Sequence, residues 1–599
     1  MRWPIVGNHL SHRILETEGR APPLSPPLAG GRSASSRRVW RWGGDRWALV
    51  VLLLLAWTLR LSPALENRLH ADEALYGYWG LLIARGEDPW LAAALVDKPP
   101  LVPYLVASSQ ALLGRSRGGA ELAVRWPGLT LGLLTVPLVA ALAYSLYCDR
   151  WVALTAAVAT AFSPFAILFS ATAFTDTPML GLGLAACLAA ARRWPGWAGL
   201  LAGLSFAAKP TGLVFLPLAL GASLIRTSNA RGSMCHGSMC HLPPHRGGLG
   251  RACVSLVVCF SLVVALVFAW NAVRIGWGGE SFWRIGVTRY GGVRLIWPQE
   301  LWPRLCEWVG VMRYLFVSPV VNGVLMLGLP VLVWRALPAA CSTRYRWVPA
   351  SAADVLFFSF CLIYVLVHWL WAFPIWDRYL LPLAPLLAIS LGRIFSLLVP
   401  FLHLIAARFR CCTQLIWRLP PCLTRQFTPS GREVTAISWP NARLAPLIVA
   451  GSFIARLTLL ASLILLLLTP AWHAGRSRYP VGGDHGAYDG IDAVASFLRE
   501  LPEGAVVYHH WLGWHYSYYL FDAPVYLAYW PTPAWLARDV QVFGATDPRY
   551  VTFPSWESSV RVEWALAGVG YGLTPVSTTI RRDGTISFII YRILPLRDR

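Results

Sequence analysis

Lysine is rare in this chain, and its two occurrences share a sequence context. Of the 52 lysine and arginine residues, only Lys98 and Lys209 are lysines. Each is followed by proline, in the sequences DKPP (97–100) and AKP (208–210). A compact ammonium group suits a phosphate that is approached as a point charge in a tight space, whereas the guanidinium of arginine is a wider planar fork. We therefore predict that both lysines bind phosphate, against the alternative that two lysines remain by chance.

Three acidic residues are candidates for proton transfer. Asp72 and Glu73 are adjacent, soon after the first apolar run, and Asp176 lies in a short polar sequence between two later apolar runs. A carboxylate can take a proton from a hydroxyl group, and polar residues placed between membrane spans indicate function. Structural roles are also open, because Asp72 can cap a helix N-terminus and Asp176 can be an ordinary turn residue.

The composition is that of a membrane protein with several spans. The chain has 599 residues, of which 56% are hydrophobic and only 14% are charged, whereas soluble proteins carry about 25% charged residues. Apolar runs of ~20 residues can each cross a bilayer as a helix. The predicted fold is therefore an all-α polytopic domain over 46–470. Its eleven predicted spans lie near residues 46–65, 127–148, 151–171, 178–192, 196–208, 211–226, 252–271, 317–335, 354–373, 379–400 and 444–470.

Arginine-rich loops set the predicted orientation of these spans. Cytoplasmic loops of membrane proteins are enriched in lysine and arginine. If the basic segment 1–45 is cytoplasmic, arginine clusters fall in alternate loops on the same side. Segment 1–45 lacks the features of a cleaved signal peptide, so the first span acts as an anchor. The extracytoplasmic face then receives the loop 66–126, all the candidate residues above and the segment 471–599.

The segment 471–599 differs in composition and indicates a small extracytoplasmic α/β domain. We predict helices at 489–501 and 560–567, strands at 505–508 and 549–553, and a hairpin of 578–580 with 586–593. No cysteine follows residue 470, so we expect an ordinary core rather than disulfides. The aromatic stretch 509–529 has two interpretations of equal weight. It is either a core packed on the membrane surface or a platform for sugar or acceptor.

Two further features have simple explanations. The net charge of +22 can indicate nucleic acid binding, but the surplus arginines lie in the predicted cytoplasmic loops, so we expect no nucleic acid partner. The repeat GSMCHGSMCH (232–241) suggests a zinc site. Its adjacent Cys-His pairs do not have the spacing of structural zinc ligands, and a tandem duplication explains them better. We expect no metal and no cofactor.

The polar motifs occur in an order that resembles membrane glycosyltransferases of the GT-C type. The closest resemblance is to bacterial relatives of protein O-mannosyltransferases (glycosyltransferase family 39) and of the lipid A aminoarabinose transferase. It covers residues 46–226 and, through one motif, 370–400. The motifs are DE at 72–73, DKPP at 97–100, RWP at 125–127, TDTP at 175–178, AAKP at 207–210 and RYLLPL at 378–383.

The resemblance implies a GT-C fold and an inverting transfer of a hexosyl or pentosyl unit from a polyprenyl-phosphate-linked donor. Asp72 would deprotonate or position the acceptor, Glu73 would support Asp72 or its loop, and Asp176 would be a second acid. A phosphate leaving group needs its growing negative charge held by cations. The residues implied to bind the donor phosphate are Lys98, Lys209, Arg378 and Tyr379.

The expected partners are this donor, the lipid bilayer and an extracytoplasmic acceptor, which is a protein, a lipid or an envelope glycan. The expected location is the inner membrane of a bacterium, with the N-terminus in the cytoplasm. One alternative is a transporter or flippase of a lipid-linked sugar, and another is an assembly scaffold. Transporters commonly show inverted repeats with charges near the bilayer midplane. The sequence shows no repeat of its two halves, and its polar motifs lie at one membrane face.

Overall fold

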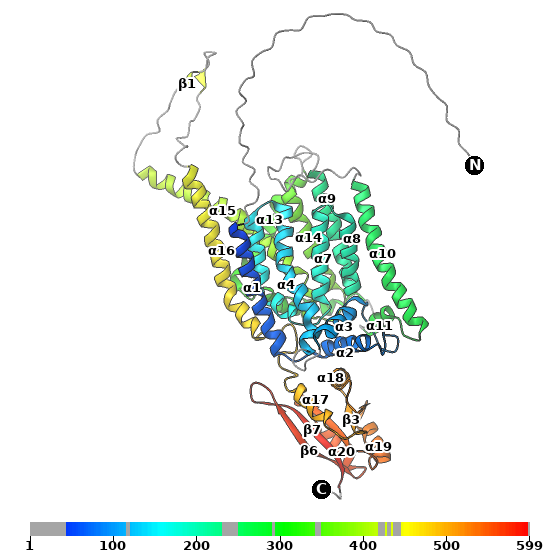
Figure 1. Ribbon diagram of the computed structural model, residues 1–599. Helices are drawn as coiled ribbons and strands as arrows, with labels where there is room; N and C mark the ends of the chain where they lie inside the picture. The colour runs from blue at the N-terminus through cyan, green and yellow to red at the C-terminus, as the bar shows by residue number, and fades with distance from the viewer. Residues whose placement is uncertain are drawn as a thin grey trace, which may run out of the picture. The chain divides into compact units, whose positions relative to one another are not determined.

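The computed structural model describes residues 43–114, 120–229, 249–289, 294–341, 349–416, 426–427, 433–434 and 445–596. The repeat at 232–241 and nearly all of the N-terminal segment 1–45 lie outside these residues. The described chain is mostly helical and ends in a small domain built on a five-stranded sheet. This arrangement confirms the predicted fold class, a helical membrane domain followed by an α/β domain (Figure 1).

All eleven predicted apolar runs are helical, and most of these helices pack side by side (Figure 1). Seven described helices are long and apolar enough to cross a membrane, or eight if the bent pair α5 and α6 forms one span. The apolar helices α7, α8 and α9 are shorter. The helices of the bundle are α1 (Gly43–Glu66), α4 (Ala120–Tyr147), α5 (Arg150–Phe162), α6 (Pro164–Ser170), α7 (Asp176–Ala191), α8 (Pro195–Ala208), α9 (Phe215–Asn229), α10 (Leu249–Gly276), α13 (Pro319–Cys341), α14 (Pro349–Leu370), α15 (Leu383–Ile416) and α16 (Ala445–Gly475).

Proline breaks the helices at two places that matter for the site. Ser163 is extended and caps α6, whose first residue is Pro164, so the predicted span 151–171 bends by 58°. In the same way α8 ends at Ala208, and Pro210 begins a 3₁₀ turn, η1 (Pro210–Val214), ahead of α9. Lys209 is the extended residue between the two helices. Its side chain therefore projects from a helix break rather than from a helix.

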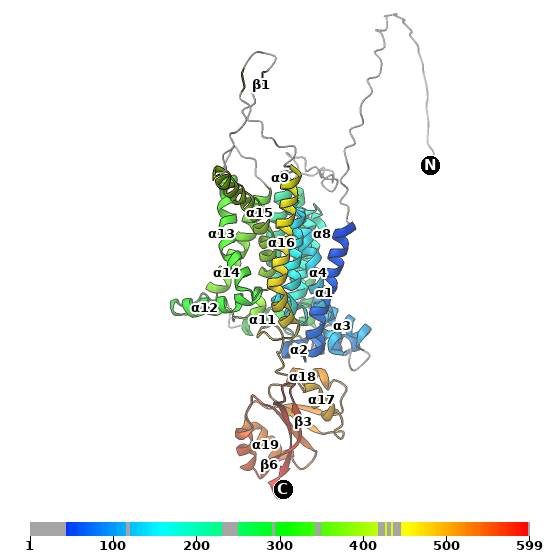
Figure 2. The ribbon, with the colours of Figure 1, turned by 90° about the vertical axis from the view of Figure 1, so that its left-hand side faces the viewer.

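The predicted loop 66–126 contains two helices, which lie at one end of the bundle together with α11 and α12 (Figures 1 and 2). A β-bridge joins Leu295 to Trp371 beside them. Helices are favoured here because backbone groups near a bilayer need internal hydrogen bonds. The elements are α2 (Ala71–Arg85), α3 (Leu101–Leu113), α11 (Phe282–Arg289), η2 (Pro298–Glu300), α12 (Leu301–Met312), η3 (Arg313–Leu315) and η4 (Asp377–Leu380); a short hairpin elsewhere pairs β1 (Gln426–Phe427) with β2 (Glu433–Val434).

The C-terminal domain has a mixed sheet with the strand order β4-β3-β5-β7-β6. Strand β3 pairs in parallel with β4 and β5, with Val506 opposite both Tyr526 and Arg549. Strand β7 is antiparallel to β5 and to β6. Two apolar clusters form the domain core. The elements are α17 (Ile491–Arg499), β3 (Val506–His509), α18 (Gly513–Tyr519), β4 (Tyr526–Tyr529), α19 (Pro533–Phe543), β5 (Arg549–Pro554), α20 (Val560–Ala567), β6 (Tyr571–Ile580) and β7 (Ile586–Pro595).

Every element predicted in this domain is present, whereas α18, β4 and α19 were not predicted. Helix α18 lies inside the aromatic stretch 509–529 and packs on α2 of the membrane domain (Figure 1). The His515 ring bonds to the Leu69 carbonyl at 3.0 Å, and the Tyr519 hydroxyl donates to Glu121. Helix α18 therefore packs on another part of the protein, and packing of the stretch on the membrane surface stays a prediction.

Candidate active site

The site is built on the first turn of α2. The ring Nδ1 of His70 accepts from the backbone N–H of Asp72 at 3.1 Å, and Glu73 accepts from the N–H of His70 at 2.9 Å. This reciprocal pair is a capping box, with histidine in the position that serine or threonine usually takes. The N-cap interpretation of Asp72 is therefore wrong. His70 accepts from the Asp72 amide, and the Asp72 carboxylate is available for another partner.

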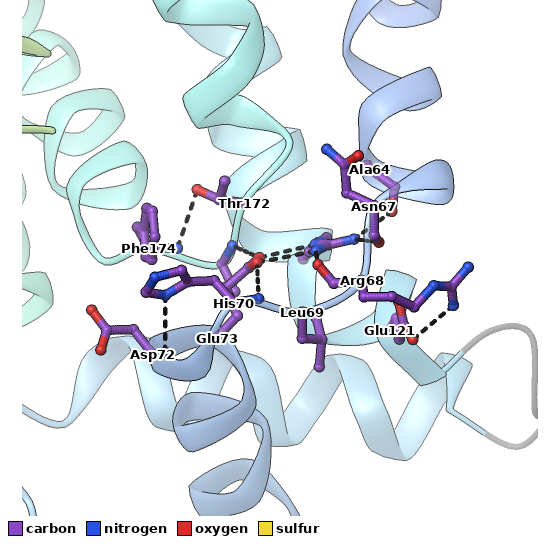
Figure 3. A network of polar contacts seen from close by, with 12 residues as sticks. Ala64, Asn67, Arg68, Leu69, His70, Asp72, Glu73, Glu121, Thr172 and Phe174 are labelled. Carbon is purple, nitrogen blue, oxygen red and sulfur yellow. Dashed lines mark hydrogen bonds and ion pairs between the residues drawn. The ribbon is translucent and has the colours of Figure 1, made fainter. Parts of the chain in front are cut away.

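Glu73 is held in a buried ion pair with Arg125 of α4. Arg125 Nε and Nη2 donate to the carboxylate at 2.9 and 3.0 Å, and both side chains are buried. Burial opposes ionisation of Glu73, but Arg125 and the donated backbone bonds keep its pKa below the ordinary value. Figure 3 shows the Asp72 side chain turned away from this network, on the other side of His70. The two adjacent acids therefore have different environments.

The same ion pair ties several segments together. Arg125 also donates to the backbone carbonyls of Ala64, Asn67 and Arg68, and Glu73 accepts from the N–H of Ala173 at 2.8 Å. These contacts join the end of α1, the start of α2 and the segment before α7. Such a network fixes where α2 begins, and with it the position of Asp72.

Asp72 pairs with Arg378, which lies 306 residues away in η4. Arg378 Nη1 donates to Asp72 Oδ2 at 2.8 Å. Asp72 keeps 36% of its side-chain surface exposed, so an incoming molecule can reach it. Burial opposes its ionisation, but Arg378 and, more weakly, His70 and Lys98 hold its pKa below the ordinary value. The guanidinium also lies over the rings of Trp376 and Phe174, which fix its orientation.

A second acid–cation pair lies beside the first. Lys209 Nζ donates to Asp176 Oδ1 at 2.6 Å, and both side chains are largely buried. The ammonium lies 4.8 Å from the ring centre of Tyr379. Burial lowers the pKa of Lys209 to about 8, although Asp176 acts in the opposite direction.

Lys98 completes the group. It pairs with its neighbour Asp97, and its charge acts on both Asp72 and Lys209. The structure therefore brings together six of the predicted residues, from five separate segments of the chain, whereas Glu73 lies in the buried pair described above. The six are Asp72, Lys98, Asp176, Lys209, Arg378 and Tyr379.

The segment 479–490, which was not predicted to contribute, also reaches this region. The N–H of Gly482 donates to Asp377 at 2.8 Å, next to Arg378. The ring of Tyr488 meets that of His70 edge-on at 6.2 Å. Four glycines at 482, 483, 486 and 490 adopt positive φ, a conformation that other residues rarely take. This glycine density was the signal in the sequence. Across the described residues, no three His, Cys, Asp or Glu side chains are grouped as metal ligands.

Comparisons with known proteins agree with the motifs. Residues 97–242 match the family model described as dolichyl-phosphate-mannose-protein mannosyltransferase. This range includes Lys98, Asp176 and Lys209. No curated protein sequence matches the chain.

Solved structures of similar fold include ArnT from Cupriavidus metallidurans bound to undecaprenyl phosphate, at 15% identity. It matches with a TM-score of 0.51 over 91% of this chain and 98% of that one. The apo form of ArnT matches over 92% of this chain and 98% of that one, with the same identity and TM-score. The archaeal oligosaccharyltransferase AglB from Archaeoglobus fulgidus, in complex with an inhibitory peptide and a dolichol-phosphate, matches at 13% identity. Its TM-score is 0.46, over 91% of this chain and 74% of that one. The likeness to ArnT and the family match confirm the resemblance to GT-C type membrane glycosyltransferases.

Proposed function

We propose that this chain transfers a sugar from a polyprenyl-phosphate-linked donor to a hydroxyl group of an acceptor, with inversion at the anomeric carbon. The reaction takes place at the extracytoplasmic face of a bacterial inner membrane. The mannosyltransferase family match and the fold shared with ArnT, a protein crystallised with undecaprenyl phosphate, support a lipid-linked donor.

One observation carries the proposal: the pairing of Asp72 with Arg378 beside the pair of Asp176 with Lys209. The two pairs put a partly exposed carboxylate next to cations that are held in place. Phosphoryl groups are bound by such clusters of cations, and a hydroxyl nucleophile needs a nearby base. An assembly scaffold would need neither.

The chemistry follows from these positions. The Asp72 carboxylate takes the proton of the acceptor hydroxyl while the oxygen of that hydroxyl forms a bond to the anomeric carbon. The bond from that carbon to the phosphate oxygen breaks, and the polyprenyl phosphate leaves with the electron pair. Lys98, Lys209 and Arg378 hold the growing negative charge. Because base and leaving group act on opposite sides of the anomeric carbon, a single displacement inverts it.

Arg378 links the two halves of this reaction. In the free protein the Arg378 guanidinium donates through Nη1 to Asp72 Oδ2 at 2.8 Å. As negative charge grows on the phosphate, the guanidinium is drawn toward it, and Asp72 becomes the stronger base. Glu73 takes no part in proton transfer and acts as a positioning residue through the cap of α2.

The test uses the purified full chain with a radiolabelled polyprenyl-phosphate sugar and membrane extract as the source of acceptor. Asp72→Asn should lower transfer by at least ~100-fold, the usual effect of losing a general base, while donor affinity stays or rises. A matched control is Asp522→Asn, because Asp522 also pairs with an arginine, Arg85, but at an exposed site.

Full transfer by Asp72→Asn would show that Asp72 is not the base. If the wild-type chain leaves every donor sugar on its lipid but moves the donor across a vesicle bilayer, the chain is a transporter and the proposal fails.

A further inference from the structure

The strands β4, β3 and β5 run parallel, so their carboxyl ends meet at one edge of the sheet. The N–H of Trp530 donates to the carbonyl of His509 at 3.1 Å and joins the ends of β4 and β3. Open α/β sheets bind ligands outside the carboxyl ends of their parallel strands. The residues leaving this edge form a group that we call the aromatic edge: His510, Trp511, Tyr529, Trp556 and Glu557.

The rings of the aromatic edge are arranged around His510. Its ring is parallel to that of Tyr529 within 12° at 5.8 Å, and Trp511 meets it edge-on at 4.9 Å. The ring centre of Trp530 lies 4.6 Å from that of the same imidazole. Trp530 is only 5% exposed, so it packs against His510 from the interior of the domain. Trp511 and Tyr529 are 60% and 54% exposed. Rings this large normally lie inside a domain, and an exposed group of them indicates a binding surface.

Polar groups lie between these rings. The Trp530 carbonyl can only accept, so His510 Nδ1 donates to it at 2.8 Å, and Nε2 is an acceptor in the neutral ring. The Glu557 carboxyl lies near His510 and the Trp511 side chain: burial raises its pKa, and these two neighbours act in the opposite direction. A sugar ring has an apolar face that lies flat on an aromatic ring and hydroxyl groups that bond to carboxylate and imidazole. A contact with anionic lipid would instead carry lysine or arginine, and a carboxylate disfavours it.

The aromatic edge reaches the candidate active site through one of its members, Trp556. Trp556 meets Tyr488 edge-on at 5.5 Å, and Tyr488 in turn contacts His70 at 6.2 Å. His70 is the N-cap of the helix that carries Asp72. Ring contacts therefore lead from Trp556 to the N-cap of the helix that carries the proposed base.

We propose that the aromatic edge binds a carbohydrate chain of the acceptor, so that the hydroxyl to be modified reaches Asp72. The acceptor is then a saccharide or a molecule that carries one. The role of the saccharide as acceptor rests on the proposed transfer function, but saccharide binding at the aromatic edge can be measured without transfer.

The test uses the full chain in nanodiscs and follows tryptophan fluorescence during titration with neutral hexasaccharides of glucose and of N-acetylglucosamine. We expect at least one hexasaccharide to bind with a Kd in the range of ~0.1–1 mM, typical of a few stacked rings. Trp511→Ala and Tyr529→Ala should each weaken binding at least ~10-fold. Tyr529→Phe, which keeps the ring, should bind as the wild type does.

Trp564→Ala is the matched control, because Trp564 is 76% exposed on α20 of the same domain and lies outside the aromatic edge. It should leave binding unchanged. The titration contains no donor, so saccharide binding is measured separately from the transfer reaction.

Three results would overturn the inference. The first is that no hexasaccharide binds the wild type at ~10 mM, a concentration well above the expected Kd. The second is that Trp564→Ala weakens binding as much as Trp511→Ala does. The third is that the fluorescence of Trp511 changes with the lipid composition of the nanodisc and not with saccharide, which would make the surface a membrane contact.

Discussion

The adjacent acids Asp72 and Glu73 should have opposite mutational effects, and Glu73→Gln is the sharper test. Glu73 accepts two bonds from Arg125, at 2.9 and 3.0 Å, and two backbone bonds, from His70 and Ala173. A glutamine removes the charge and turns an NH₂ group toward at least one of these donors. Arg125 is then a buried cation without its counter-ion.

The size of the effect follows from the burial of both partners. Breaking a fully buried ion pair by removing one partner costs about 3–5 kcal/mol. For a chain of 599 residues we expect a fall in Tm of roughly 2–4 °C. By contrast, Asp72 is partly exposed in its pair with Arg378. Its replacement by Asn should change the free energy of unfolding by no more than ~1 kcal/mol.

Thermal unfolding in detergent, followed by size-exclusion chromatography with fluorescence detection, measures both variants. The double variant Glu73→Gln with Arg125→Met removes the unpaired charge. Its fall in Tm should therefore be smaller than the sum of the falls in Tm of the two single variants. The carbonyls of Ala64, Asn67 and Arg68 lose their donor, so recovery should be partial. If Glu73→Gln melts within ~0.5 °C of the wild type, equivalent to under 1 kcal/mol, yet loses transfer, the positioning role is refuted and Glu73 belongs to the reaction.

Two further predictions concern donor binding and the docking of the C-terminal domain. Burial lowers the pKa of Lys209 to about 8, so its ammonium loses the proton as pH rises through 8. The Kd for the donor, measured by titration, should be constant below pH 8 and rise by up to ~10-fold per pH unit above it; Lys209→Arg should abolish this rise, and an unchanged profile would exclude Lys209 from phosphate binding. A Cβ at Gly77 of α2 would lie 2.8 Å from the Tyr518 ring of α18. Gly77→Ala should therefore expose the linker 476–490 to limited proteolysis, whereas Gly310→Ala, where a Cβ meets no described atom within 4 Å, should not; equal cleavage of both would refute the packing argument.

Much of the fold could be predicted from the local sequence. Apolar runs near the length of a bilayer crossing predicted the helices of the bundle but not α2, α3, α11 and α12, because a helix is the element that satisfies its own backbone in lipid. Strand and turn signals predicted β3, β5 and the hairpin of β6 and β7. The break at Ser163 and Pro164 was missed, because a proline at a helix start differs from one inside a helix only through the residue before it. Helix α18 was missed because its aromatic residues have no clear period.

The sequence by itself determined which residue types stand at which positions: two lysines before prolines, a pair of adjacent acids, and an arginine–tyrosine motif late in the chain. It could not decide that Asp72 binds Arg378, a residue 306 positions away, or that Glu73 is buried against Arg125 instead. Neighbours in a helix differ by about 100° in direction, so their partners depend on what each face meets. Those partners come from distant segments, and only the packing of the helices brings them within hydrogen-bond distance.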